Sequence, residues 1–213
     1  MEFNDLLRIV GHLPLFETGL LLSGDVSPLG IRKQLSRWTA SGKIYQLRRG
    51  LYCLAPPYQK VRPHPFFIAN RLQTGSYVSL QSALSYYGMI PEHTPLTTSV
   101  AAARPAAYQT PLGQFDYRHV QVGWFQGYRS LDLGNEQAAF IASPEKALLD
   151  FVYLQPGGDS AEFLHSLRLQ ALDQVDRARL RQLAAAAGRP KLLRALRVIE
   201  QIIEEDVSGY EPL

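Results

Sequence analysis

Between Ser27 and Gly42 the apolar positions recur at the spacing of an amphipathic helix. The apolar residues at i, i+4 and i+7 are Ile31, Leu35 and Trp38. Ser27 can accept a hydrogen bond from a free helix N–H, and Pro28 suits the first helical position. Gly42 offers a stop, because glycine accepts the left-handed conformation that is common after a helix. The pattern therefore predicts a helix over residues 28–41.

Two short apolar runs follow this helix. Lys43–Leu47 and Leu51–Leu54 have the composition of strands, and Arg48-Arg49-Gly50 separates them as a turn. The segment therefore predicts a β-hairpin with two arginines at its tip. A helix followed by such a hairpin is typical of a winged helix-turn-helix, in which the helix enters the major groove of DNA and the hairpin reaches phosphates or the minor groove.

The chain before Ser27 supplies the two other helices that this fold needs. Apolar residues on one face predict a first helix over residues 2–13, which Pro14 ends. The apolar run Phe16–Leu22 predicts the second helix, and residues 23–26 the turn after it. We therefore expect a winged helix-turn-helix domain over residues 1–55.

The remaining chain predicts a second domain. Prolines in residues 56–65 indicate a stiff connector. Residues 66–213 predict an α+β domain, with a small antiparallel sheet and flanking helices. The predicted strands are Thr97–Ala103, Gln114–Val122, Trp124–Ser130 and Ala138–Ala142. The predicted helices are Phe66–Gln73, Leu80–Tyr87, Lys146–Leu154, Ala161–Leu172, Val175–Ala187 and Pro190–Glu205.

Charge is distributed unevenly along the chain, whose net charge is only +3. Between Val26 and Pro91 there are nine basic residues and no Asp or Glu, whereas the rest holds 13 basic and 19 acidic residues. An acid-free basic segment favours a polyanion as the partner of this part of the chain.

Six residues of the first domain are candidate DNA contacts. Those on the outer face of the helix are Arg32, Lys33, Ser36 and Arg37. Those at the hairpin tip are Arg48 and Arg49. Tyr45 and Tyr52, on adjacent strands, either stack on sugars or pack within the domain. A second basic run from Arg177 to Arg197 is interleaved with acids, and is either a solvated helix face or a surface for a partner or nucleic acid.

The sequence contains little that points to catalysis or to a cofactor. The single cysteine, Cys53, excludes an intramolecular disulfide and a Cys-cluster zinc site, and no two histidines have metal-ligand spacing. Asp-x-Asp pairs, Gly-rich phosphate loops and Gly-x-Ser-x-Gly motifs are absent. We therefore predict a non-enzymatic protein without cofactor or metal. With no long apolar run and no signal-like N-terminus, a cytoplasmic protein without a membrane partner is expected.

Three sequence stretches carry a family resemblance. They read GKIYQLRRGLY at residues 42–52, YVSLQSAL at residues 77–84, continuing to Gly88–Pro91, and ASPEKALLD at residues 142–150. In this order they are similar to the wing, the motif after the wing domain and a later helix of the AbiEi-like antitoxins of type IV toxin–antitoxin systems. The resemblance covers nearly the whole chain.

The resemblance implies a bacterial DNA-binding transcriptional regulator. Its winged-helix domain would repress its own operon by binding the operator, with the six residues above as DNA contacts. Its C-terminal domain would neutralise a nucleotidyltransferase-like toxin, and this antagonism need not involve a stable complex. The alternative is a protein-interaction module that does not bind DNA and sequesters a partner, because a fold alone does not settle function.

Overall fold

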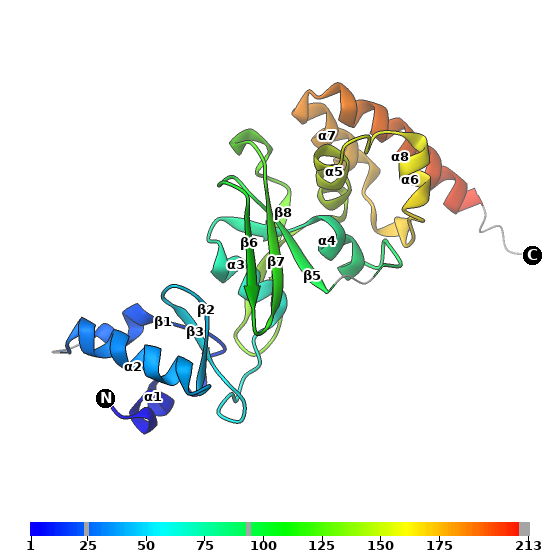
Figure 1. Cartoon of the computed structure of the whole chain (residues 1–213). Helices are drawn as coiled ribbons and strands as arrows, with labels where there is room; N and C mark the ends of the chain where they lie inside the picture. Colours follow the sequence, from blue (N-terminus) through cyan, green and yellow to red (C-terminus); the bar gives the residue numbers. More distant parts are fainter. Residues whose placement is uncertain (24–25, 93–94, 209–213) are drawn as a thin grey trace, which may run out of the picture.

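The computed structural model describes residues 1–23, 26–92 and 95–208. Figure 1 shows three parts in a row: helices with a small sheet at the N-terminal end, a larger sheet in the middle, and a group of helices at the C-terminal end. Within the described residues, no helix is both long and apolar enough to cross a membrane.

The N-terminal part combines two helices, a short 3-10 helix and a three-stranded antiparallel sheet. Its elements are α1 (Phe3–Val10), β1 (Phe16–Glu17), the 3-10 helix η1 (Thr18–Leu22), α2 (Pro28–Ala40), β2 (Ile44–Arg48) and β3 (Leu51–Leu54). The strands lie in the order β1-β3-β2. The bounds of α2 and of the hairpin agree closely with the predicted ones.

The predicted helix over residues 16–22 is only partly confirmed, because Thr18–Leu22 form the 3-10 helix η1 whereas the first two residues are a strand. Phe16 and Glu17 instead pair with β3, Phe16 lying opposite Tyr52, and Thr18 donates its backbone N–H to the Gly50 carbonyl at 3.0 Å. A seven-residue apolar run does not distinguish a helix from a strand by periodicity, and here the edge of β3 supplies the hydrogen-bond partners. The first helix ends at Val10, earlier than predicted. The predicted turn over residues 23–26 includes Gly24 and Asp25, which lie outside the described residues.

Helix α2 forms where its sequence signals predict it. The Ser27 hydroxyl accepts a hydrogen bond from the Gly30 backbone N–H at 3.3 Å, with Pro28 in the first turn. Gly42 follows the helix with a φ of +69°, a value that glycine adopts without strain. The buried face of α2 belongs to a small core whose members include Ile31, Leu35, Trp38, Leu6, Val10, Phe16 and Ile44.

The middle of the molecule is a six-stranded mixed sheet with the order β6-β7-β5-β4-β9-β8. Its strands are β4 (Ser76–Val78), β5 (Leu96–Ala101), β6 (Ala106–Thr110), β7 (Gly113–His119), β8 (Tyr128–Asp132) and β9 (Ala138–Ala142). The prediction of a small antiparallel sheet is therefore wrong, since β5 pairs with β7 and β4 pairs with β9 in parallel. Strand β4 is too short to give a sequence signal, and β6 alternates only weakly between apolar and polar residues.

Helices cover both faces of this sheet. Tyr77 lies opposite Val100 of β5, and Tyr117 lies opposite Ser99 of the same strand. Because neighbouring residues of a strand point to opposite faces of the sheet, the two tyrosines also point to opposite faces. The Tyr117 hydroxyl donates to the Ala69 carbonyl of α3 (Pro65–Leu72), and the Tyr77 hydroxyl to Asp150 of α5 (Pro144–Leu154). Helix α4 (Leu80–Tyr86) packs beside α5.

The C-terminal helices lie next to α5 and extend the molecule beyond the sheet (Figure 1). They are α6 (Ala161–Ser166), α7 (Arg177–Ala187) and α8 (Pro190–Ser208), and two 3-10 turns complete the described chain, η2 (Val122–Trp124) and η3 (Leu172–Gln174). Helix α6 ends earlier than predicted, at a segment where Arg168 and Ala171 both have a φ of +49°. This left-handed backbone cannot continue a right-handed helix.

The hairpin β2–β3 takes part in two cores. Tyr52 and Leu54 face the small core with α2. The inward residues that join the large core of the six-stranded sheet are Leu47, Leu51 and Cys53, together with Leu15. The N-terminal part is thus packed directly against the middle of the molecule as well as joined to it by the connector.

A buried ion pair lies between the sheet and α5. The Lys146 ammonium contacts Asp150 at 2.6 Å, and both side chains are fully buried. Asp150 also accepts hydrogen bonds from Tyr77, Ser79 and Trp124. Lys146 lies 3.5 Å from the centre of the Trp124 ring, a cation–π contact. Burial lowers the pKa of Lys146 to about 8, and Asp150 opposes this shift through its charge and its hydrogen bond.

Candidate nucleic-acid interface

The outer face of α2 carries the four predicted helix contacts. Its exposed members are Arg32, Lys33, Ser36 and Arg37. They occupy the side opposite Ile31, Leu35 and Trp38, which are buried. The amphipathic pattern read from the sequence therefore places the four side chains together on one solvent-facing surface.

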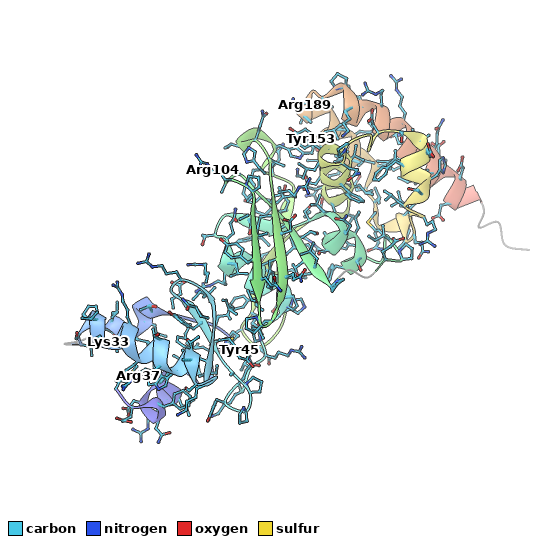
Figure 2. All side chains as sticks on the ribbon, in the orientation of Figure 1. Lys33, Arg37, Tyr45, Arg104, Tyr153 and Arg189 are labelled. Atoms are coloured by element: carbon cyan, nitrogen blue, oxygen red, sulfur yellow. The ribbon has the colours of Figure 1, made fainter. Side chains whose placement is uncertain are left out.

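The cations of this face have no acidic partner within the described part of the chain. Over residues 1–23, 26–92 and 95–208, no ion pair involves Arg32, Lys33 or Arg37. Glu17 contacts Arg71 instead, at 3.2 Å. Figure 2 shows Lys33 and Arg37 along α2, at the end of the molecule far from Arg189. An exposed face with uncompensated positive charge is suited to attract phosphate groups.

The two hairpin arginines have different surroundings. Arg48 closes β2 rather than lying in the turn, and its Nη2 and Nε atoms donate to the Arg71 carbonyl at 3.2 and 3.4 Å. This carbonyl belongs to the last turn of α3, where a cation is favourable because the helix dipole is negative there. Arg49 is exposed. The hairpin therefore offers Arg49 freely, whereas Arg48 is engaged within the chain.

The two hairpin tyrosines pack within the protein. Tyr52 is buried and stacks on Phe16, with ring centres 5.7 Å apart. Tyr45 is half-buried and packs against the large core. Of the two roles considered for them, the contacts favour packing over stacking on sugars.

The arginines of the C-terminal helices are mostly paired. The ion pairs are Arg177–Glu204 at 3.5 Å, Arg179–Glu145 at 3.8 Å, Arg181–Glu200 at 2.5 Å and Arg194–Asp159 at 2.7 Å. Lys191 donates to the carbonyls of Tyr153 and Gln155, near the end of α5. Arg189 lies over the Tyr153 ring and donates to Gln121 (Figure 2). These contacts favour a solvated, internally compensated helix face.

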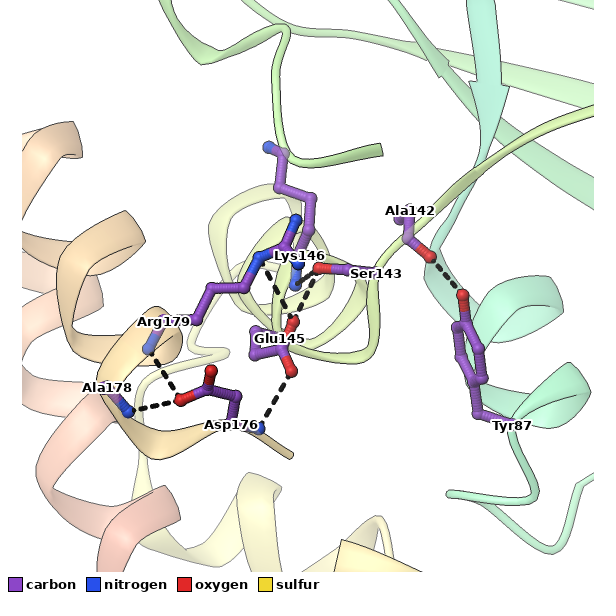
Figure 3. A network of polar contacts seen from close by, with 8 residues as sticks. All are labelled: Tyr87, Ala142, Ser143, Glu145, Lys146, Asp176, Ala178 and Arg179. Carbon is purple, nitrogen blue, oxygen red and sulfur yellow. Dashed lines mark hydrogen bonds and ion pairs between the residues drawn. The ribbon is translucent and has the colours of Figure 1, made fainter. Parts of the chain in front are cut away.

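A polar cleft of about 740 Å³ lies between α4, β8 and the C-terminal helices. Figure 3 shows the contacts of Glu145, which lines this cleft and accepts hydrogen bonds from the Ser143 hydroxyl at 2.7 Å and the Asp176 backbone N–H at 3.0 Å. Glu145 thereby joins the start of α5 to the start of α7. Arg129 and Arg179 line the cleft together with Glu145, which lies 3.8 Å from Arg179. No local pattern in the sequence predicts this cleft, because its residues come from distant segments.

Among the described residues, the histidines and carboxylates are not grouped as metal ligands. The part of the chain that the structure describes contains no cluster of three or more His, Cys, Asp or Glu residues able to hold a metal ion. His64 has a structural role, because its Nδ1 atom accepts a hydrogen bond from the Phe66 backbone N–H and so begins α3. Burial lowers the pKa of His64 below its ordinary value.

Comparisons with known proteins concern the fold alone. No protein-family model matches the chain, and no curated protein matches it. Among solved structures the chain is similar to the crystal structure of the RV2827C protein from Mycobacterium tuberculosis, with a TM-score of 0.56 and 14% sequence identity. The similarity covers 92% of this chain and 76% of the other. At this identity it supports an α+β architecture with a mixed sheet and a small antiparallel sheet.

Proposed function

We propose that this protein binds double-stranded DNA through the outer face of α2. The observation that carries the proposal is the combination of Arg32, Lys33 and Arg37 on one exposed face, without an acidic partner among the described residues. A helix fits the major groove, which is about 12 Å wide, and arginine can donate two hydrogen bonds to one guanine. Arg37 and Arg32 are the candidates for base contacts, and Lys33 and Ser36 for phosphates.

In this proposal the hairpin is a wing with one free arginine. Arg49 contacts the DNA backbone or the minor groove. Arg48 fixes the wing by donating to the Arg71 carbonyl at the end of α3. The wing then approaches DNA at an angle set by the rest of the molecule, because Leu47 and Leu51 are buried in the large core.

The biological role that we propose follows from the family resemblance. The protein is a bacterial repressor of its own operon and the antitoxin of a type IV toxin–antitoxin system. Its toxin is nucleotidyltransferase-like and is antagonised without the need for a stable complex. The paired arginines of α7 and α8 support a division of labour, with DNA binding at the N-terminal end and toxin antagonism elsewhere.

The test is fluorescence anisotropy of the full chain with the DNA upstream of its own gene, beside a scrambled duplex, over a salt series. We expect selective binding whose affinity falls steeply with salt, because each phosphate contact releases a counterion and contributes about 0.9 to the slope of log K against log salt. Arg37→Gln and Arg49→Gln should each weaken binding. The matched control is Arg197→Gln, an exposed arginine on α8 at the other end of the molecule.

Weak and equal binding to both duplexes would contradict the proposal. The protein-interaction module would then be the better reading, and a stoichiometric partner recovered by the full chain would support it. An equal loss for Arg37→Gln and Arg197→Gln would indicate a non-specific charge effect and would also contradict the proposed face.

A further inference from the structure

The outer face of α2 begins with an apolar residue. Leu29 lies one turn before Arg32 and Lys33, at the spacing that places all three on one side of the helix. Its side chain is 62% exposed, although the opposite face of the same helix is well buried. Two further exposed apolar side chains, Leu20 and Val26, precede it in the chain. The basic face therefore has an apolar N-terminal end.

Gly30 is a second feature of this end. It has an ordinary helical φ, and a Cβ atom built on it would meet only the Ser27 side chain, at 3.5 and 3.7 Å, which is normal van der Waals contact. The fold thus has room for alanine, a better helix former than glycine. A glycine that the fold does not require is explained if another molecule approaches the backbone closely at this point.

We propose that Leu29 and Gly30 form a base-reading tip, in which Leu29 packs on the C5-methyl group of a thymine and Gly30 lets the helix backbone approach the base edges. This inference rests on the proposed DNA binding and specifies its target. The N-terminal residues of a recognition helix contact base edges, and among the four bases only thymine presents a methyl group in the major groove. Leu29 therefore selects a thymine where the arginines further along α2 select guanines or phosphates.

The first test compares thymine with uracil, which lacks the methyl group. A duplex selected by the full chain from a random pool is resynthesised with each thymine replaced singly by uracil. We expect one position at which the replacement lowers affinity roughly fourfold, the effect of one buried methylene-sized group. Leu29→Ala should lower affinity for the selected duplex to a similar degree, and uracil at that position should then have no further effect. The control is Leu193→Ala, another exposed leucine, on α8.

The second test uses Gly30→Ala, with Gly123→Ala as its control because a Cβ there meets nothing within 4 Å. We expect Gly30→Ala to leave the melting temperature unchanged or higher while lowering DNA affinity at least fourfold. Gly123→Ala should change neither quantity.

The outcomes separate this inference from the proposed function. If the selection yields no preferred duplex, DNA recognition by the protein is itself refuted. If a duplex is selected and Arg37→Gln weakens binding to it, but no uracil position depends on Leu29, the base-reading tip is refuted and DNA binding stands. If Gly30→Ala bound DNA with wild-type affinity, the proposed close approach of the helix backbone to the base edges at Gly30 would likewise be refuted.

Discussion

Two helical surfaces of this molecule are rich in arginine, and they differ in where their acids lie. The outer face of α2 holds Arg32, Lys33 and Arg37 without an acidic partner among the described residues. On α7 and α8, by contrast, Arg177 and Arg181 contact Glu204 and Glu200. A count of basic residues does not separate the two surfaces. Their difference arises from the placement of carboxylates: among the described residues, acids pair with most arginines of α7 and α8 but with none of the three cations of α2.

The largest effect is expected where a paired cation is completely buried. Asp150→Ala leaves the Lys146 ammonium without its carboxylate and removes the acceptor of three further donors. We expect the free energy of unfolding to fall by about 3–5 kcal/mol, measured by urea denaturation. The control Asp173→Ala, an exposed aspartate, should change it by less than about 0.5 kcal/mol. A loss as small for Asp150→Ala would mean that this ion pair does not stabilise the packing of α5 on the six-stranded sheet.

The next effect contrasts the two surfaces directly. Replacing Arg32, Lys33 and Arg37 together by glutamine should lower DNA affinity roughly 100-fold near physiological salt, through the loss of about three phosphate or base contacts. The melting temperature of this triple variant should equal that of the wild-type protein. Replacing Arg177, Arg181 and Arg194 together should instead lower stability, by about 0.2–1 kcal/mol for each exposed pair, and leave DNA affinity unchanged. Both variants are measured by anisotropy and thermal melting. If the C-terminal variant lost DNA affinity and the α2 variant kept it, the C-terminal surface would be the one that binds DNA.

A smaller effect concerns Cys53 of β3, which is buried in the large core where the hairpin meets the six-stranded sheet. Burial raises the pKa of its thiol from 9.0 to about 12. Above pH 9 the unfolded chain therefore loses a proton that the folded chain keeps, so stability falls as pH rises, by about 1 kcal/mol between pH 9 and 10. Denaturation at both pH values should detect this fall. It should shrink in Cys53→Ala, and an undiminished fall in that variant would mean that the thiol is open to solvent.

The local pattern of the sequence predicted the surface elements well. The bounds of α2 follow from Ser27, Pro28 and Gly42, whose roles depend on neighbours within one turn. The exposed side of α2 follows from the spacing of Ile31, Leu35 and Trp38. The same local period fails at the start of α8, where Leu193 continues the spacing of Leu196, Ile199 and Ile203 and yet is exposed, while Leu192 is buried. Which of two adjacent leucines is buried depends on the elements that pack against the helix, and these come from distant parts of the sequence.

Features that depend on distant segments had no local signal. The strand at Phe16 forms because β3 offers it an edge, and the parallel pairing of β4 with β9 joins residues about sixty positions apart. Arg48 was expected only at the hairpin tip, and its contact with the Arg71 carbonyl depends on how the hairpin meets α3. The acidic partners of the arginines on α7 and α8 could not be predicted either, because a count of charges along the sequence does not show which side chains meet in the fold.

The double packing of the hairpin bears on how such a protein can change its target. Because Leu47, Leu51 and Cys53 are buried against the large sheet, transfer of residues 1–55 alone to another protein would expose their apolar side chains to water. Recombination of this segment as an interchangeable module is therefore disfavoured. Under the proposed function, new operator preferences would evolve through substitutions on the outer face of α2, where side chains change without cost to either core.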